Sequence, residues 1–233
     1  MKKLKAIAVV MTLFFLGGCG ALGNSSEEEP KRPAEMDPED LPQVDAFQKE
    51  FSRQFMESID EVEEGYYLMR SGIDAFTIYF PEDATLMENG YGYDGNHFEK
   101  LRFAYESEKE NRGYTLDFQY NYGGNANHPE WKLDGLRKKW GFNDEWKELE
   151  DDEGTTFYGT FVEETKYGED VIVVGYKVSK NDVPQAMEFS QMVSCVNMDV
   201  PSCKLDHQKE ESFVLEWVKS ITFMREGGSK TDE

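Results

Sequence analysis

Residues 114–122 constrain the fold more than any other segment, because large apolar or aromatic residues alternate there with polar ones. The large residues are Tyr114, Leu116, Phe118, Tyr120 and Tyr122, and the polar ones are Thr115, Asp117, Gln119 and Asn121. Successive side chains of a β-strand point to opposite faces, so this period of two separates the two sets. The segment therefore predicts a strand with one aromatic face and one polar face.

Antiparallel partners for this strand are predicted on both sides of it in the sequence. Alternating apolar residues at 101–105 precede it, and Asn111-Arg112-Gly113 between the two runs indicates a hairpin. A second hairpin is predicted from residues 156–165 and 170–179, where Gly168 suits the positive φ of the turn. Further strands are expected at residues 75–80, before Pro81, and at residues 187–193.

Two amphipathic segments predict helices that cover this sheet. Pro129 occupies a first helical position, and Gly141 ends the run that follows it. The second helix is expected to start near Asp206. Its apolar residues are Phe213, Val214, Trp217 and Ile221. A mostly antiparallel sheet of meanders and hairpins covered by helices is an α+β architecture.

The N-terminus predicts export. Three lysines precede an apolar run from Ala6 to Leu16, which at about 1.5 Å per residue is too short for a lasting transmembrane helix. Leu16-Gly17-Gly18-Cys19 resembles the lipobox of bacterial lipoproteins. The resemblance implies cleavage between Gly18 and Cys19 and a diacylglyceryl thioether on Cys19, whose two acyl chains give stable anchoring. The alternative is an ordinary secretory signal with an incidental cysteine.

These features divide the chain into five parts. Residues 1–18 are the signal peptide, 19–45 an acidic, proline-containing tether, 46–64 a docking helix, 65–225 the globular α+β domain and 226–233 a disordered tail. The docking helix is predicted from an apolar stripe at steps of four residues. The stripe consists of Phe47, Phe51, Phe55 and Ile59.

The composition limits the partners that the chain can bind. Removing residues 1–18 takes away three lysines and no acidic residue, which moves the formal net charge from −22 to −25. Such a surface repels phosphate backbones and anionic headgroups, which argues against nucleic acid and against peripheral adhesion to anionic lipid. The alternative is that the acidity serves solubility alone.

The cysteines other than Cys19 are Cys195 and Cys203, an even pair in an exported domain. We expect a disulfide that closes a loop of about nine residues, with two unpaired thiols as the alternative. A metal site is not expected from these two thiols.

No residues of this sequence are assigned a catalytic role. The chain contains no Gly-x-Ser-x-Gly or His-Glu-x-x-His motif, and its histidines, His97, His128 and His207, lie far apart in sequence. The acids of 94–96 and 151–153 lack the regular spacing of a calcium loop, so they are interpreted as solvated loop residues. No cofactor and no metal site are predicted.

Tyrosine and glycine are concentrated at the predicted loop ends. The candidate binding residues are Tyr91, Tyr93, Tyr120 and Tyr122. Tyrosines on glycine-rich loops bring large contact area at low entropic cost, which favours a patch that binds a sugar or a peptide. The alternative is that the tyrosines pack on the sheet and the glycines only turn the chain.

Two family resemblances follow from short stretches of sequence. Residues 72–83, the hairpins and the closing Ser220-Ile221-Thr222-Phe223 resemble the Mog1/PsbP-like α-β-α sandwich. Residues 37–44, 64–68 and 80–83 resemble the YvcA-type lipoproteins of bacilli, a similarity that includes the late pair of cysteines. This resemblance implies an envelope-attached protein of Gram-positive type, and it provides no catalytic residues to carry over.

The hypothesis from the sequence is a lipid-anchored protein on the extracytoplasmic face of the cell membrane. We expect a monomeric, non-enzymatic binding module whose partner is an envelope protein or a wall component. One alternative is an envelope hydrolase whose catalytic residues converge only in the fold. Another is a structural or assembly factor for a membrane complex.

Overall fold

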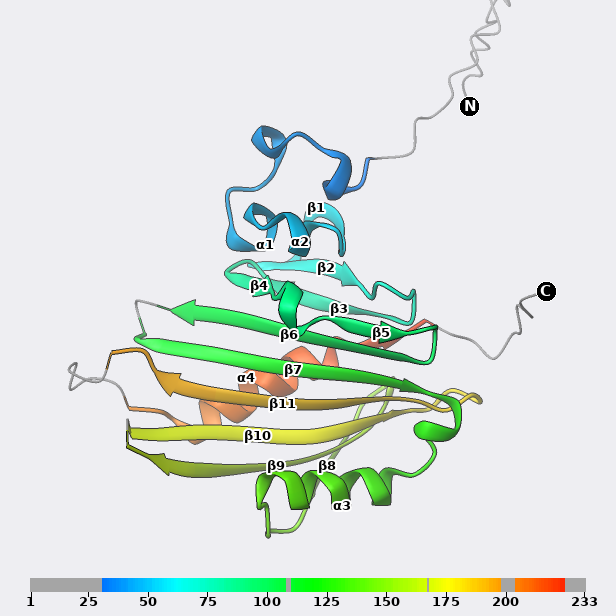
Figure 1. Ribbon diagram of the computed structural model, residues 1–233, viewed down its shortest axis with the longest axis vertical. Coiled ribbons are helices and arrows are strands. Elements are labelled where there is room, and N and C mark those ends of the chain that lie inside the picture. Colours follow the sequence, from blue (N-terminus) through cyan, green and yellow to red (C-terminus); the bar gives the residue numbers. More distant parts are fainter. Residues whose placement is uncertain (1–30, 108–109, 167, 198–203, 225–233) are drawn as a thin grey trace, which may run out of the picture. The chain divides into compact units, whose positions relative to one another are not determined.

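Two antiparallel sheets form the framework of the computed structural model (Figure 1). The structure describes residues 31–107, 110–166, 168–197 and 204–224, all of which belong to one compact unit. The small sheet has the strand order β1-β2-β3-β12. Its strands are β1 (Met56–Glu63), β2 (Tyr66–Arg70), β3 (Phe76–Pro81) and β12 (Thr222–Phe223).

The large sheet has the strand order β4-β6-β7-β11-β10-β9-β8, with β5 paired to β6 beside β4. Its strands are β4 (Ala84–Leu86), β5 (Gly92–Asp94), β6 (Phe98–Ser107), β7 (Arg112–Tyr122), β8 (Lys147–Glu150), β9 (Gly154–Thr165), β10 (Gly168–Ser179) and β11 (Gln185–Cys195). Both predicted hairpins are confirmed as β6–β7 and β9–β10. Gly168 has φ +114° at the second turn, as expected.

The two predicted helices are confirmed with their end signals. Helix α3 (Pro129–Trp140) has its proline in the first turn and ends at Gly141, whose left-handed φ of 66° places its N–H on the carbonyl of Arg137. Helix α4 (His207–Lys219) begins after Asp206. The Asp206 carboxylate accepts hydrogen bonds from the backbone N–H groups of residues 208 and 209, at 3.0 and 3.2 Å.

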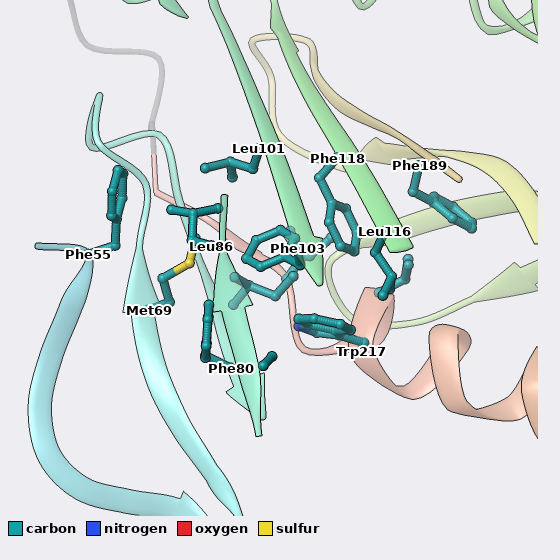
Figure 2. Packing of buried hydrophobic residues seen from close by; sticks show 14 of the residues in the cluster. Phe55, Met69, Phe80, Leu86, Leu101, Phe103, Leu116, Phe118, Phe189 and Trp217 are labelled. Atoms are coloured by element: carbon teal, nitrogen blue, oxygen red, sulfur yellow. The ribbon is translucent and has the colours of Figure 1, made fainter. Parts of the chain in front are cut away.

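One face of the large sheet is buried by the small sheet and by α4. The ring of Trp217 in α4 lies 5.1 Å from that of Phe103 and 5.7 Å from that of Phe118. Phe80 of β3 reaches the same Phe103 ring at 5.6 Å, so β3, β6, β7 and α4 share one aromatic core (Figure 2). The aromatic face predicted for residues 114–122 is therefore confirmed as the core-facing side of β7.

The opposite face of the large sheet is covered by α3 over the β10 and β11 strands. Leu136 of the helix packs against Tyr176 and Ala186, which point away from α4 because they alternate with the core-facing residues. The mostly antiparallel α+β class predicted from the sequence is confirmed.

The prediction of one docking helix at residues 46–64 is wrong. Only two short helices form there, α1 (Asp45–Gln48) and α2 (Glu50–Arg53), because Lys49 between them is extended with ψ 118°. The chain then enters β1 at Met56, where pairing with β2 outweighs helical periodicity. Phe47 and Phe55 are nevertheless buried and Phe51 packs against the core, whereas Ile59, the last residue of the predicted stripe, is exposed.

The C-terminal part of the predicted tether also differs from the expectation. Residues 33–35 and 38–40 form short 3-10 helices, η1 (Pro33–Glu35) and η2 (Pro38–Asp40), and Leu41 is buried in the core. A free tether therefore cannot extend to residue 45. Residues 1–30 and 225–233, which hold the predicted signal, Cys19 and tail, lie outside the described residues. Within the described ranges, no helix is both long and apolar enough to span a bilayer.

Candidate binding site at the tyrosine loops

Tyr91 follows the short helix η3 (Glu88–Gly90) and inserts its ring between the small helices and the large sheet. Its ring meets Phe51 of α2 at 5.6 Å and Phe55 at 5.1 Å, both in edge-to-face geometry. Edge-to-face pairs place the positive rim of one ring against the negative face of the other. Tyr91 is therefore held largely by packing.

A buried carboxylate fixes the hydroxyl end of the same ring. Glu99 is fully buried, accepts a hydrogen bond of 2.8 Å from the backbone N–H of Gly72, and is hydrogen-bonded to the Tyr91 hydroxyl. Burial, together with the negative charge of Glu99, raises the pKa of Tyr91 well above its usual range. The phenol therefore stays protonated and keeps its hydrogen bond across the physiological pH range.

Tyr93 extends from this fixed support into solvent. It is 64 % exposed, and its ring centroid lies 6.0 Å from that of Tyr91. In the β5–β6 register it pairs with Glu99, so it stands on the same face of the sheet as the buried carboxylate. The exposed ring therefore rests beside an ordered one.

Tyr122 and His97 form a second aromatic pair at the same end of the large sheet. Their rings lie 5.9 Å apart at an interplanar angle of 30°, and the backbone N–H of Tyr122 donates to the carbonyl of His97 at 3.0 Å. Tyr122 is half-buried and His97 is exposed. Glu99 of β6 pairs with Tyr93 of β5 on one side and with Tyr120 of β7 on the other. Tyr122 lies two residues after Tyr120. The Tyr91–Tyr93 pair and the Tyr122–His97 pair therefore flank one patch of the sheet.

Tyr120 does not belong to an exposed binding surface. Its side chain is fully buried, its hydroxyl donates to the Gln185 side-chain oxygen at 3.1 Å, and its ring lies 5.7 Å from that of Phe76. The prediction of Tyr120 as a binding residue is corrected on this ground, because its position in the inward-facing row of β7 places it in the core.

Two residues near this end of the fold, Glu99 and Trp131, were not predicted from the sequence. Glu99 belongs to the inward-facing row of β6, and continuing the alternation of Leu101 and Phe103 back by one step would have identified a buried acid. Trp131, in the first turn of α3, is 67 % exposed and stacks on His128 at 3.7 Å. The helical pattern of the sequence does not indicate that Trp131 is exposed.

Of the two acidic loops interpreted as solvated, residues 94–96 agree with the expectation, whereas Asp151 does not. Residues 94–96 are exposed at the turn before β6. Asp151 instead accepts hydrogen bonds of 2.9 Å from the backbone N–H groups of Glu153 and Gly154 and pairs with Lys177 at 2.9 Å. No group of three or more possible metal ligands is found among the described residues.

Cys195 is the last residue of β11. Cys203 lies outside the described residues, so the pairing of these two cysteines stays a prediction.

Comparisons with known proteins add a family to this geometry. The family model described as "Putative lipoprotein YvcA" matches residues 42–222. A protein of Bacillus subtilis (strain 168) with the same printed name is 30% identical over 236 residues, with 96% of this chain and 98% of that protein covered.

A solved structure is also similar in part. A protein from Bacteroides thetaiotaomicron VPI-5482, crystallised and solved at 1.50 Å resolution, aligns with a TM-score of 0.41 and 17% identity. The alignment covers 71% of this chain and 51% of that one, so the chain spans about half of its length. A TM-score of this size does not establish a shared fold.

Proposed function

The chain belongs to the YvcA family, and we propose that it is a lipid-anchored protein of the cell envelope whose folded domain binds a partner. The printed name of the Bacillus subtilis relative supports the lipid anchor, as does Leu16-Gly17-Gly18-Cys19 in this chain. In this proposal the signal is cleaved after Gly18, Cys19 is lipidated, and the monomeric domain stands on the extracytoplasmic face of the membrane.

The domain in this proposal is a variant of the Mog1/PsbP-like sandwich. Support comes from the stacking of the small sheet and α4 on one face of the large sheet and of α3 on the other. The role is binding rather than catalysis. The residues that carry it are Tyr91, Tyr93 and Tyr122, and the partner is an envelope protein or a wall component.

The single observation behind the site is that the exposed ring of Tyr93 rests on Tyr91, which Glu99 and two phenylalanines hold in place. An aromatic side chain ordered before binding loses little entropy when a partner covers it. When a partner covers such a ring, most of the apolar area of the ring is buried in the complex. This arrangement favours recognition of a surface, because the rings project from the end of the sheet.

Photo-crosslinking in intact cells tests this site. A photoreactive residue at position 93 or 122 should crosslink the partner, while the same residue at position 131, which is equally exposed on α3, should give a weaker or different pattern. Tyr93→Ala with Tyr122→Ala should lower recovery of the partner at least about tenfold, the usual scale for two aromatic hot spots. Equal crosslinking from position 131, or unchanged recovery of the partner with the double variant, would remove the tyrosine loops from the site.

A further inference from the structure

Helix α3 presents a basic surface on a strongly acidic protein. Four of its twelve residues are basic and two are acidic, whereas the whole chain carries a formal net charge of −22. The basic residues are Lys132, Arg137, Lys138 and Lys139. Basic residues in the last turn of a helix interact favourably with its dipole, so this charge alone does not indicate a ligand. Two further features of the outward face of α3 do.

The first feature is Trp131, whose side chain lies mostly in solvent. It is 67 % exposed, although tryptophan is on average a highly buried residue. Its ring stacks on the imidazole of His128, with 3.7 Å between the ring centroids and 14° between the planes. His128 is in turn hydrogen-bonded to Glu130 at 3.2 Å. The stack covers one face of the indole and orders the ring, so the other face is available to a partner.

The second feature is Gly135, one helical turn beyond Trp131 on the same exposed face. A Cβ atom on Gly135 would meet nothing within 4 Å among the described residues, and its φ is not left-handed. Neither packing nor backbone geometry therefore requires a glycine here. Glycine in a helix interior is also less stable than alanine. Its effect on the surface is to leave a shallow gap between Trp131 and Lys138.

Lys138 lies at the other end of this gap, and its side chain is 74 % exposed. The ammonium group is paired with Asp134 at 2.5 Å, but an exposed i,i+4 pair is weak and exchanges readily with another anion. Seven residues separate Lys138 from Trp131, which corresponds to about 10 Å along the helix. A ligand of this length contacts an aromatic ring at one end and a cation at the other.

An anionic carbohydrate fits these features. The negative face of an aromatic ring attracts the partially positive C–H groups of a sugar ring. The exposed ammonium group suits a carboxylate or a phosphate of the same glycan. An anionic membrane fits less well, because a planar bilayer would bring its charge against the acidic remainder of the protein. A short linear glycan reaches α3 alone.

We propose that the outward face of α3 binds an acidic oligosaccharide. One sugar ring stacks on the open face of Trp131, the next lies over Gly135, and an anionic group of the glycan pairs with Lys138. This site goes beyond the tyrosine loops, and its ligand is a different molecule from their partner. A crosslink formed at position 131 should therefore carry carbohydrate.

The test is a titration of the full mature chain in non-ionic micelles whose headgroups contain no sugar, followed through the indole ¹H–¹⁵N resonance of Trp131. Trigalacturonate is the probe and should give a saturable shift. Its trimethyl ester, which has the same rings without the charge, should bind about fivefold more weakly. Acetylated triglutamate amide, which has three carboxylates without sugar rings, should bind at least about tenfold more weakly. No saturable shift with trigalacturonate, or equal affinity for either control, would overturn the proposal.

Calorimetric titration of two variants tests the aromatic end and the gap. Trp131→Ala should lower the affinity for trigalacturonate at least about tenfold. Gly135→Gln should lower it to a similar extent because the new side chain fills the gap, while the fold becomes at least as stable as that of the parent. Loss of binding together with unchanged or increased stability cannot result from unfolding. Unchanged affinity in Gly135→Gln would refute the assigned surface.

Two lysine variants separate a specific contact from general electrostatics. Lys138→Gln should weaken binding about fivefold, the scale of an exposed ion pair. Lys219→Gln makes the same charge change in the last turn of α4, where Lys219 is likewise paired with a carboxylate, that of Glu216 at 2.6 Å. It should leave the affinity unchanged. If both variants weaken binding equally, the glycan responds only to the net charge of the protein and the contact with Lys138 is refuted.

Discussion

Arg112 at the start of β7 and Glu210 in α4 form an ion pair inside the protein, with 2.6 Å between Nη1 and Oε1 and no exposed surface on the carboxylate. Tyr114 adds a hydrogen bond to the same carboxylate. The pair ties the first turns of α4 to the central strands of the large sheet. Burial raises the pKa of Glu210 even though the positive charge of Arg112 opposes that effect.

Arg112→Ala should lower the free energy of unfolding by about 3–5 kcal/mol near neutral pH, because it leaves a buried charge without its partner. The loss should be smaller near pH 5. The pKa of Glu210 is higher in the folded state than the value of 4.5 in the unfolded state. Glu210 therefore destabilises the folded state increasingly as pH rises above 4.5. Urea unfolding at pH 5 and pH 8 measures both effects. A loss below about 1 kcal/mol at both pH values would show that the pair is energetically neutral.

The two partners of the Lys177–Asp151 pair should respond unequally to substitution. Lys177 is fully buried, and besides Asp151 it donates to the carbonyl of Val218 at 3.1 Å. Asp151→Ala should cost about 3–5 kcal/mol because the buried ammonium loses its counter-ion. Lys177→Met should cost about 1–2 kcal/mol, since Asp151 is partly exposed and keeps its backbone donors. Thermal and urea unfolding of the two variants give the order, and a reversed order contradicts this account.

The ion pair of Glu57 and Arg70, at the surface of the small sheet, makes a pH-dependent contribution to the stability of the fold. Two hydrogen bonds of 2.7 Å from the Arg70 guanidinium lower the pKa of Glu57 below 4.5, against the opposing effect of burial. The stabilisation is therefore complete above pH 4.5 and is lost as pH falls through the lowered pKa. Glu57→Gln should remove about 1 kcal/mol at pH 7 and almost none at pH 2. The difference between the unfolding curves of the two proteins at these pH values checks the sign.

Gly72 is required by the close approach of the Tyr91 hydroxyl. A Cβ atom on Gly72 would lie 2.4 Å from that oxygen and 3.0 Å from Oε1 of Glu99. Gly72→Ala should therefore displace the Tyr91 ring, cost about 1–3 kcal/mol and weaken partner binding. Gly92→Ala is the control, because a Cβ there meets nothing within 4 Å. Crosslinking yield and unfolding free energy should change in the first variant and not in the second.

Much of the fold follows from local patterns. The β6–β7 and β9–β10 hairpins and the limits of α3 and α4 are confirmed because alternation, a turn glycine or a capping residue acts within a few residues. The helix predicted at residues 46–64 does not form, because the structure there depends on contacts that are distant in sequence. Phe47, Phe51 and Phe55 do pack inward, but the strand that starts at Met56 is stabilised by β2, which no local period reveals.

The candidate site was only partly predictable. Tyr93 and Tyr122 lie at the ends of strands, as the glycine-rich loops indicate. Tyr120 lies on the buried face of β7 because it alternates in step with Leu116 and Phe118.

We propose that a lipid on Cys19, rather than any affinity of the folded domain for the bilayer, holds this protein at the membrane. The most direct measurement is cell fractionation of a Cys19→Ser variant, with mass spectrometry of the N-terminal peptide of both proteins. We expect a diacylglyceryl-modified Cys19 in the membrane fraction of the parent, and a variant without acyl chains that leaves this fraction. A variant that still sediments with membranes as the parent does, or a parent whose Cys19 carries no lipid, would contradict it.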